Sequence, residues 1–540
     1  MAHQKACDKD RSKPCYRTTI NGYTAVFYYF PLGRYASMLR YGARRPLMKH
    51  IDAFTKILPY LQKMRRLRHT TSIIYYDIAC VAGKDAIKDE SDLLNEYFAE
   101  LAKISQDENF IALVKEGKED KDASVMEKRL FENLYKEIEF MENFTLEEYL
   151  EYRKTISDCN EYWRICRPKN DFKGWLPYWK KQVESSRKVA RKMMKEGQTP
   201  YDTCLDSYEP GNNEAFIDSI FNPLKDTLIP LLKKAKEKQK SYTIPALKSY
   251  DKIKQKEMSL RMLEAIHYDM DKGALMESAH PFSDAFAKND ARVTTKFLPE
   301  DWRSNVFTCL HEGGHALEFQ NWTDEMFENH VENMATSAIC ETHSRFFENI
   351  IGRSKAFMPI LQKDAAETLD PELGKIPAED FYHLMNQIQP WLIRCEADEL
   401  SYCLHIIIRY EIEKDLINGK IECEDVPAIW KQKYHDYLGV EVTSDKDGCM
   451  QDTHWSEALW GYFPSYALGN LYGAMIKEKI EGEMDFEGAI KDNRIDKIVE
   501  WMREKDYCYD YLKPNDWIMK VVGKPLSAEP YIKYLKEKFE

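Results

Sequence analysis

The sequence predicts a large, mainly α-helical protein with a small β-element beside a helix that carries two histidines. Apolar residues recur with the three-and-four spacing of a buried helix face, as in Ile51, Phe54, Ile57 and Leu61. Hydrophobic residues make up 44% and aromatic residues 13% of the 540 positions, which is enough for a sizeable core. A strand-like alternation with β-branched residues stands out at residues 292–297.

The charge distribution sets the expected domain boundary. Residues 1–49 hold ten lysines and arginines against two aspartates, whereas the whole chain has a net charge of −12. We therefore expect a basic N-terminal extension at 1–49 and one helical domain at 50–540. Arg-rich, acid-poor segments can direct proteins to organelles, but aspartates and helix-breaking residues within this one leave a family-specific extension or a gene-model artefact open.

Amphipathic helices are predicted along most of residues 50–540. A turn-rich loop at 198–213, with two prolines and a glycine, interrupts the pattern. The helical stretches after the first lie near residues 90–116, 124–140, 145–167, 176–196, 214–239, 247–270, 376–418, 425–438, 484–503 and 527–539. A strand at 292–297 is also positioned to pair with an extended peptide.

Composition excludes several classes of partner. The acidic net charge of −12 argues against nucleic acid. The longest early apolar run, residues 23–32, is too short to span a bilayer, and we find neither a transmembrane helix nor a convincing signal peptide. The 13 cysteines are scattered without a CxxC pair, which is typical of reduced thiols. We therefore expect a cytoplasmic protein that does not bind membranes.

The segment HEGGH at 311–315 is the strongest candidate metal site. His311 and His315 are four residues apart, so both imidazoles can reach one cation from the same helix face. Glu312 stands beside them, where a general base for a zinc-bound water belongs. Glu341 follows in a second helical stretch. Two histidines and one glutamate leave a tetrahedral zinc one open position, which is the catalytic pattern.

Each of these residues also has a less specific interpretation. An HExxH segment arises by chance in roughly a few per cent of chains of this size, and it can mark a surface helix with solvated histidines. Gly313 and Gly314 cost about 0.5–1 kcal/mol each within a helix, which indicates close approach of a substrate strand or a packed helix. Glu341 is an expensive buried charge unless it binds metal or pairs with a residue such as Arg345.

Two further segments carry side chains suited to binding and catalysis. Arg394 is predicted to be partly buried, and its planar guanidinium matches a carboxylate such as a peptide C-terminus. An ordinary helical ion pair with Asp398 is the alternative. His454 and Tyr466 are donors of the kind that stabilise an oxyanion, although for a single segment an aromatic core cluster with one satisfied histidine is the more common case.

Six motifs occur in a recognisable order and spacing. They are HPF at 280–282, DARVT at 290–294, HEGGH at 311–315, ET and SR within 341–345, IRCEAD at 393–398 and GCMQDTHW at 448–455. In this set the chain resembles the thermostable carboxypeptidase Taq family of metallocarboxypeptidases over roughly residues 50–540. The resemblance implies a mostly helical fold with a long substrate groove, a homodimer, and metal-dependent release of single C-terminal residues with broad specificity.

The resemblance also implies roles for individual residues. His311, His315 and Glu341 would bind Zn²⁺, with Co²⁺ or another divalent metal as an alternative, and Glu312 would be the base. Arg394 would hold the terminal carboxylate of a peptide substrate. The substrate end of the site would be lined by His280, Arg292, Gln451, Asp452 and His454. Tyr466 fits the oxyanion-stabilising tyrosine of related zinc peptidases, with Tyr462 as the reserve candidate.

The chain departs from the family pattern beside its glutamate ligand. Cys340 stands where the family usually has histidine, and Thr342 and His343 stand where it tends to serine and glutamine. Residues 318–320 read EFQ in place of the usual YEQ. Because these positions neighbour the metal, metal affinity and preference are open.

Two rival functions remain open from the sequence. One is an oligoendopeptidase of the related helical HExxH type, which needs no carboxylate-binding arginine. The other is a non-catalytic helical binding protein with a vestigial metal site. Since the ligands and the base are all present, an active metallocarboxypeptidase is the expectation.

Overall fold

The computed structural model describes residues 15–20, 23–28, 50–239 and 250–540. The chain divides into two compact units, Met1–His50 and Ile51–Glu540. In the smaller unit, β1 (Cys15–Ile20) pairs with β2 (Tyr23–Tyr28) in an antiparallel hairpin. Most of the predicted basic extension at 1–49 lies outside the described residues.

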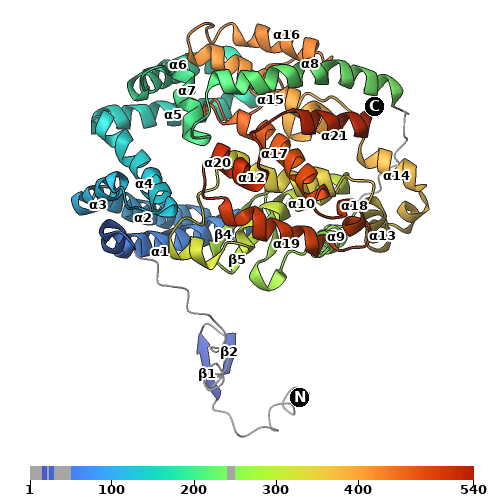
Figure 1. Ribbon diagram of the computed structural model, residues 1–540, viewed down its shortest axis with the longest axis horizontal. Coiled ribbons are helices and arrows are strands. Elements are labelled where there is room, and N and C mark those ends of the chain that lie inside the picture. The colour runs from blue at the N-terminus through green and yellow to red at the C-terminus, as the bar shows by residue number, and fades with distance from the viewer. Residues whose placement is uncertain (1–14, 21–22, 29–49, 240–249) are drawn as a thin grey trace. The chain divides into compact units, whose positions relative to one another are not determined.

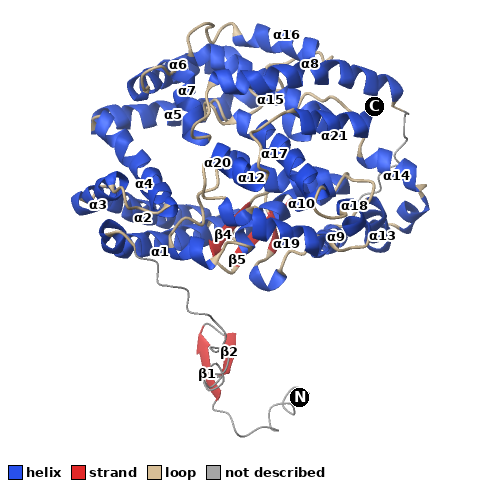
Figure 2. Ribbon diagram, in the orientation of Figure 1, coloured by secondary structure: helices blue, strands red, loops and turns tan. Residues whose placement is uncertain are grey.

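The larger unit is built almost entirely of helices, as Figure 2 shows. Its first helices are α1 (Asp52–Cys80), α2 (Ile87–Ser105), α3 (Glu108–Glu119), α4 (Val125–Asn143), α5 (Leu146–Cys166), α6 (Phe172–Met193), α7 (Pro200–Tyr208), α8 (Glu214–Lys238) and α9 (Lys252–Ala265). The later helices are α10 (Trp302–Gln320), α11 (Asp324–Glu328), α12 (Ser337–Arg345), α13 (Met358–Thr368), α14 (Ala378–Met385), α15 (Glu399–Ile417), α16 (Val426–Leu438), α17 (Phe463–Glu481), α18 (Phe486–Lys491), α19 (Ile495–Lys505), α20 (Pro514–Val521) and α21 (Glu529–Phe539). The mainly α-helical fold class is therefore confirmed.

Short helical segments connect several of these helices. The π-helical segment η3 (Phe346–Ile351) continues α12 directly. The 3-10 segments are η1 (Arg167–Lys169), η2 (Met270–Lys272), η4 (Pro371–Lys375), η5 (Arg394–Glu396) and η6 (Tyr507–Tyr509).

The loop predicted at 198–213 is wrong in part, because it contains α7. Pro200 occupies the first turn of that helix. Backbone N–H groups in the first turn have no partner within the helix, so the lack of an N–H in proline costs no hydrogen bond there. Thr199 and Asp202 form a capping box in front of it. Pro200 therefore begins a helix here, and Pro210 lies in the short connection between α7 and α8.

The single helix predicted at 376–418 is also wrong. The chain leaves the helical path after α14, passes through η5 and begins α15 at Glu399. Asp398 is the N-cap of α15, and its carboxylate accepts a hydrogen bond from the Ser401 backbone N–H at 2.9 Å. Arg394 and Asp398 therefore do not form the predicted helical ion pair.

A three-stranded sheet lies beside α10, where the sequence predicted a small β-element with one short strand at 292–297. Its strands are β3 (Leu275–Glu277), β4 (Ser283–Ala287) and β5 (Asp290–Thr295), in the spatial order β3-β5-β4. β3 runs parallel and β4 antiparallel to β5. Because β5 is paired along both edges, the expected pairing of a peptide with this strand is wrong, and only β3 and β4 have free edges.

Helix α12 packs between α10 and α17 near the centre of the larger unit (Figure 1). Glycines permit both close approaches. A Cβ added at Gly314 of α10 would lie 2.6 Å from the carbonyl oxygen of His343, and one at Gly469 of α17 would lie 2.8 Å from the Glu341 backbone. Of the two explanations offered for the mid-helix glycines, a packed helix is therefore the one observed.

Eleven cysteines among the described residues, from Cys80 to Cys508, are free thiols. Throughout the described part of the chain, we find no helix whose length and apolar character would let it cross a membrane.

Candidate active site

The two histidines and the glutamate predicted as metal ligands lie together on neighbouring helices. His311 and His315 project from α10, with ring centroids 5.1 Å apart. Glu341 comes from α12, and its Oε2 lies 3.8 Å from Nε2 of His311. The donor atoms of all three residues lie within 4.8 Å of one another. This arrangement fits one divalent cation held by two imidazoles and a carboxylate.

Glu348 fixes the orientation of His311 from the far side of the ring. Its Oε2 lies 2.9 Å from Nδ1 of His311 and 3.0 Å from a guanidinium nitrogen of Arg345. A carboxylate on the remote nitrogen holds an imidazole in the tautomer that leaves Nε2 free for a metal. Arg345 also lies 3.7 Å from Glu341, so the alternative ion pair between these two residues is present. This contact is longer than the 3.0 Å contact between Arg345 and Glu348.

Burial and neighbouring charges shift the pKa values of the two imidazoles in opposite directions. Burial first, and then the neighbouring His311, lower the pKa of His315 well below its usual value, so its ring is neutral and able to bind a metal. For His311, burial is the largest influence and opposes protonation, but the hydrogen bond to Glu348 and the charge of Glu341 outweigh it and raise the pKa. A cation between His311 and Glu341 would take the place of that proton, so the donor set fits a divalent metal.

Glu312 occupies the position expected of a general base. Its side chain is buried beside the two histidines, and its Oε2 accepts a hydrogen bond from the Ser283 hydroxyl of β4 at 2.9 Å. Burial raises the pKa of Glu312, although His311 and Ser283 oppose the shift. A raised pKa makes this carboxylate a stronger proton acceptor than one in water.

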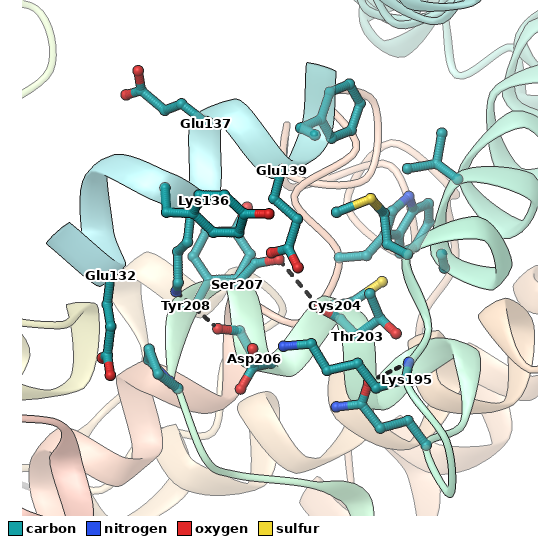
Figure 3. A pocket seen from close by; sticks show the side chains of 18 of the residues that line it. Glu132, Lys136, Glu137, Glu139, Lys195, Thr203, Cys204, Asp206, Ser207 and Tyr208 are labelled. Atoms are coloured by element: carbon teal, nitrogen blue, oxygen red, sulfur yellow. Dashed lines mark hydrogen bonds between the residues drawn. The ribbon is translucent and has the colours of Figure 1, made fainter. Parts of the chain in front are cut away.

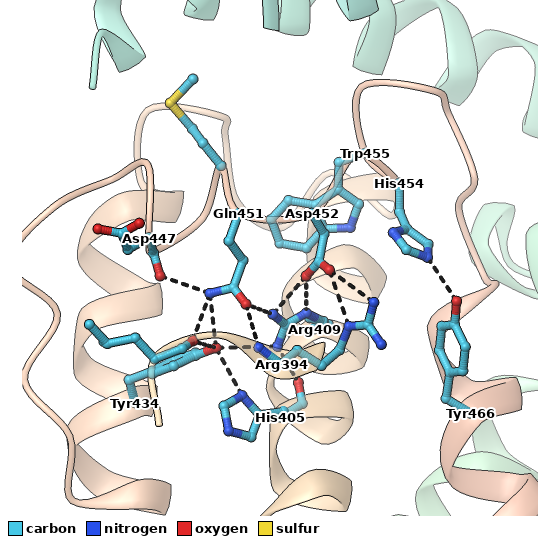
Figure 4. Close-up of polar contacts among 12 residues, drawn as sticks. Arg394, His405, Arg409, Tyr434, Asp447, Gln451, Asp452, His454, Trp455 and Tyr466 are labelled. Atoms are coloured by element: carbon cyan, nitrogen blue, oxygen red, sulfur yellow. Dashed lines mark hydrogen bonds and ion pairs between the residues drawn. The ribbon is translucent and has the colours of Figure 1, made fainter. Parts of the chain in front are cut away.

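Arg394 sits in a buried cluster of charges (Figure 4). Its guanidinium donates to Asp452 at 3.0 Å, and Arg409 of α15 lies 2.7 Å from the other carboxylate oxygen. A second nitrogen of Arg394 donates to the Tyr402 hydroxyl at 3.1 Å. Two guanidinium groups against one carboxylate leave one positive charge in excess, which suits an incoming anion.

His454 and Tyr466 are a contacting pair at the edge of the same cluster. Nε2 of His454 lies 3.2 Å from the Tyr466 hydroxyl, and the Arg394 guanidinium lies 4.7 Å from the Tyr466 ring centroid. Burial, the largest influence, raises the pKa of Tyr466 well above its usual value, so its hydroxyl stays protonated. The Tyr462 ring lies 5.2 Å from that of Tyr466.

The remaining predicted substrate residues have different surroundings. The Gln451 side chain is fully occupied within the cluster, since its oxygen accepts from Arg394 N–H and from Arg409 while its nitrogen donates to the Asp447 and Leu392 carbonyls. Arg292 of β5 forms a two-point pair with Asp290 at 2.8 and 2.9 Å. His280 is exposed in the loop between β3 and β4.

The predicted metal ligands are not among the residues that line two of the cavities in the structure. One of about 500 Å³ borders Arg345, Glu348 and Tyr402, next to the back of His311. Another of about 710 Å³ lies among α4, α6 and α7 and is lined by residues such as Lys136, Lys195 and Asp206 (Figure 3). The predicted metal ligands line neither cavity, so cavity size does not identify the site.

Sequence reasoning missed three supporting residues. Glu348 lies seven positions past Glu341, and this same-face spacing was an available signal. Arg409 and Ser283 come from elements that only the fold brings to Asp452 and Glu312. No local pattern marks either residue.

The fold and the site define the class of the protein. Two histidines of an HExxH helix and a glutamate from a neighbouring helix, with a buried carboxylate beside them, are the parts of a metal-dependent peptidase. The chain belongs to the carboxypeptidase Taq (M32) metallopeptidase family, whose sequence model matches residues 56–539.

Comparisons with individual proteins agree. Carboxypeptidase 1 of Bacillus subtilis is 34% identical over 487 residues, covering 89% of this chain and 97% of the relative. The crystal structure of an M32 carboxypeptidase from Deinococcus radiodurans superposes with a TM-score of 0.86 at 25% identity, covering 90% of this chain and 98% of that one. Metallocarboxypeptidase 1 of Trypanosoma cruzi gives a TM-score of 0.85 at 28% identity, covering 90% and 99%.

The protein is therefore a metallocarboxypeptidase, and it acts on peptides. The family resemblance and the enzymatic activity predicted from the sequence are confirmed. The oligoendopeptidase and the non-catalytic binding protein are not favoured by these comparisons.

Proposed function

We propose that this enzyme removes single residues from free peptide C-termini with broad specificity, using a zinc ion held by His311, His315 and Glu341. The observation that carries the proposal is the convergence of these donors within 4.8 Å beside buried Glu312. Co²⁺ or another divalent metal is the alternative occupant.

Glu312 is proposed to move the proton in the reaction. When bound, a divalent metal supplies a Lewis acid that polarises the scissile carbonyl and makes a water more acidic. Glu312 accepts the proton from the attacking water and delivers it to the leaving amine. The hydrogen bond from Ser283, 2.9 Å from Glu312 Oε2, holds the carboxylate in place during both transfers.

Tyr466 and His454 are proposed to stabilise the developing oxyanion. The raised pKa of Tyr466 keeps its hydroxyl available as a donor. His454 lies 3.2 Å from that hydroxyl and orients it, and Tyr462 is the reserve donor.

Arg394 is proposed to bind the substrate's terminal carboxylate. The surplus positive charge of Arg394 and Arg409 over Asp452 supplies the attraction, and Asp452 and Gln451 hold the two guanidinium groups in position. Gln451 and Asp452 are thus proposed to position the two arginines rather than to contact the substrate themselves. His280 and Arg292 line the approach to the site.

The wider setting is proposed from the sequence. Residues 50–540 form the catalytic domain and residues 1–49 a basic extension. The enzyme is cytoplasmic and a homodimer, and neither nucleic acid nor membrane is a partner.

Product analysis with one free and one amidated peptide tests the proposed function. We expect mass spectrometry to find a ladder of single C-terminal losses from the free peptide only. Glu312→Gln should abolish turnover while metal stays bound, whereas Glu328→Gln, on an exposed residue, should keep full activity. Internal fragments, or an active Glu312→Gln variant, would contradict the proposal.

The same peptides separate a binding role of Arg394 from a structural one. Arg394→Ala should lower kcat/KM for the free-acid peptide by about 30-fold or more, because a buried charge-assisted contact contributes about 2–5 kcal/mol. Any residual cleavage of the amidated peptide should fall far less. Equal losses on both peptides would show that Arg394 is structural only.

A further inference from the structure

Behind the active-site helices lies a second cluster of ionisable side chains, formed by Glu318, His343, Asp506 and Asp510. Glu318 is on α10 and His343 on α12, and the aspartates flank η6. Their side chains are at most 1% exposed, whereas those of His311 and Glu341 are 17% and 11% exposed. The cluster is thus sealed from solvent, unlike the catalytic donors.

His343 lies at the centre of the cluster. Its Nδ1 is 2.8 Å from Oε2 of Glu318, while its Nε2 is 3.3 Å from Oδ2 of Asp506 and 3.9 Å from Oδ1 of Asp510. The other oxygen of Asp506 accepts a hydrogen bond from the Trp517 indole at 3.0 Å, which aims Oδ2 toward His343. One donor atom each from Glu318, His343 and Asp510 lie within 4.8 Å of one another.

Four buried atoms in this cluster have no hydrogen-bond partner of regular geometry within the described ranges, since the 3.3 Å approach of His343 Nε2 to Asp506 Oδ2 is an ion-pair contact. They are Nε2 of His343, Oδ2 of Asp506 and both carboxylate oxygens of Asp510. No lysine or arginine among the described residues pairs with Glu318, Asp506 or Asp510. Three buried carboxylates around one imidazole are costly unless something neutralises them.

We propose that His343, Asp506 and Asp510 bind a second divalent metal ion, separate from the one proposed for catalysis, and that Glu318 positions His343 for it. Nε2 of His343 and the two aspartates supply the donors that face one another. Glu318 holds the opposite nitrogen of the ring, as carboxylates do for metal-binding histidines. An imidazole among carboxylates suits a transition metal such as Zn²⁺ rather than Ca²⁺, which takes oxygen donors only.

The role of this ion is structural. Solvent and substrate have no access to the cluster, so the metal takes no part in hydrolysis. It links α10, α12 and the segment around η6, and α12 carries Glu341. His343 is also one of the departures from the family pattern, so the ion gives a physical reason for that substitution. Because the cluster is sealed, the metal enters as the chain folds.

Zinc counting on the full-length protein tests the proposal. The protein is expressed in zinc-supplemented medium, desalted into metal-free buffer and analysed by mass spectrometry of the elements. We expect two zinc ions per chain in the wild type. The double variant His311→Ala/His315→Ala should keep one, and Asp510→Asn should also keep one. Asp516→Asn, on an exposed residue nearby, should keep two.

The rival is a cation-free cluster in which protons take the place of the metal. It predicts one zinc in the wild type, none in the histidine double variant and an unchanged count in Asp510→Asn, and any of these results would overturn the proposal. If Asp510→Asn does not fold, anomalous scattering at the zinc edge from wild-type crystals decides. A peak beside Nε2 of His343 supports the second site, and its absence there excludes it.

Discussion

At the scale of single residues, the proposed metal ligands are held by groups that contact them on the side facing away from the proposed metal. Glu348 contacts Nδ1 of His311 at 2.9 Å and is itself held by Arg345 at 3.0 Å. Arg345 and His311 lower the pKa of Glu348 to about 2 although burial, the largest influence, opposes them, so it is a carboxylate at neutral pH. Its charge would therefore strengthen His311 as the proposed metal ligand.

Replacing Glu348 should weaken metal binding more than folding. For Glu348→Gln we expect metal affinity to fall about 10- to 100-fold, because the negative charge behind His311 is lost. Competition with a chelator of known affinity measures the change, and Glu372→Gln, on an exposed residue, is the control. A folded Glu348→Gln variant with wild-type affinity would show that Glu348 does not tune the metal.

His454 should make stability depend on pH. Burial first, and then Arg394 and Arg409, lower its pKa from 6.5 to about 4. Because the pKa of His454 is lower in the folded than in the unfolded protein, the unfolded chain takes up the proton first as the pH falls. The free energy of unfolding is therefore highest above pH 6.5 and decreases as the pH falls toward 4. The decrease amounts to about 3 kcal/mol.

Urea unfolding of metal-free protein at several pH values measures this effect. Wild type should lose about 3 kcal/mol more than His454→Gln between pH 6.5 and 4, since the other titrating groups are common to both. Parallel pH profiles for the two proteins would show that His454 does not titrate as its burial implies.

At the scale of elements, the position of Glu341 is set by how closely α12 approaches its neighbours. The α10 helix contacts α12 through Gly314, and α17 contacts it through Gly469. The π-helical segment η3 then continues α12 and carries Glu348 to His311. Irregular helical turns of this kind are frequent at functional sites.

Adding one methyl group at Gly314 should force α10 and α12 apart. Alanine would improve helix propensity by about 0.5–1 kcal/mol. The new Cβ would nevertheless lie 2.6 Å from the His343 carbonyl oxygen, and backbone cannot move aside as a side chain can. We expect a net loss of about 1–3 kcal/mol in the free energy of unfolding, measured with urea.

Gly83→Ala is the matched control, because an added Cβ there meets no atom within 4 Å. It should leave stability unchanged or slightly raised. A Gly314→Ala variant as stable as this control would show that the helices have room to separate.

At the scale of the whole molecule, the larger unit contains every residue of the proposed active site. The family match also begins at residue 56, within that unit. Both hydrophobic clusters of the core belong to it as well. We therefore expect Ile51–Glu540 to contain what both folding and the proposed chemistry require.

A chain that begins at residue 50 should fold and act as the full chain does. We expect an unchanged melting temperature, metal content and kcat/KM on a free-acid peptide. Differential scanning calorimetry and the peptide assay measure these quantities. A truncated chain that melts earlier or loses activity would assign residues 1–49 a part in the catalytic domain.

The sequence by itself determined the fold class, the family and the proposed metal ligands. Helical periodicity is a local property, so most helices were placed correctly. The four-residue spacing of His311 and His315 puts both rings on one helix face whatever surrounds them. The ordered motifs strengthened the roles already expected of Glu341 and Arg394. Local reasoning failed where capping and prolines redirect the chain, as at Pro200 and Asp398.

Only the tertiary structure decided which partners these residues have. Arg394 contacts Asp452, 58 positions away, rather than Asp398, because the chain leaves the helix after α14. Ser283 reaches Glu312 through the sheet, and Asp510 reaches His343 from the far end of the chain. Hydrogen bonds and ion pairs act over a few ångströms regardless of sequence separation, so no local pattern contains them.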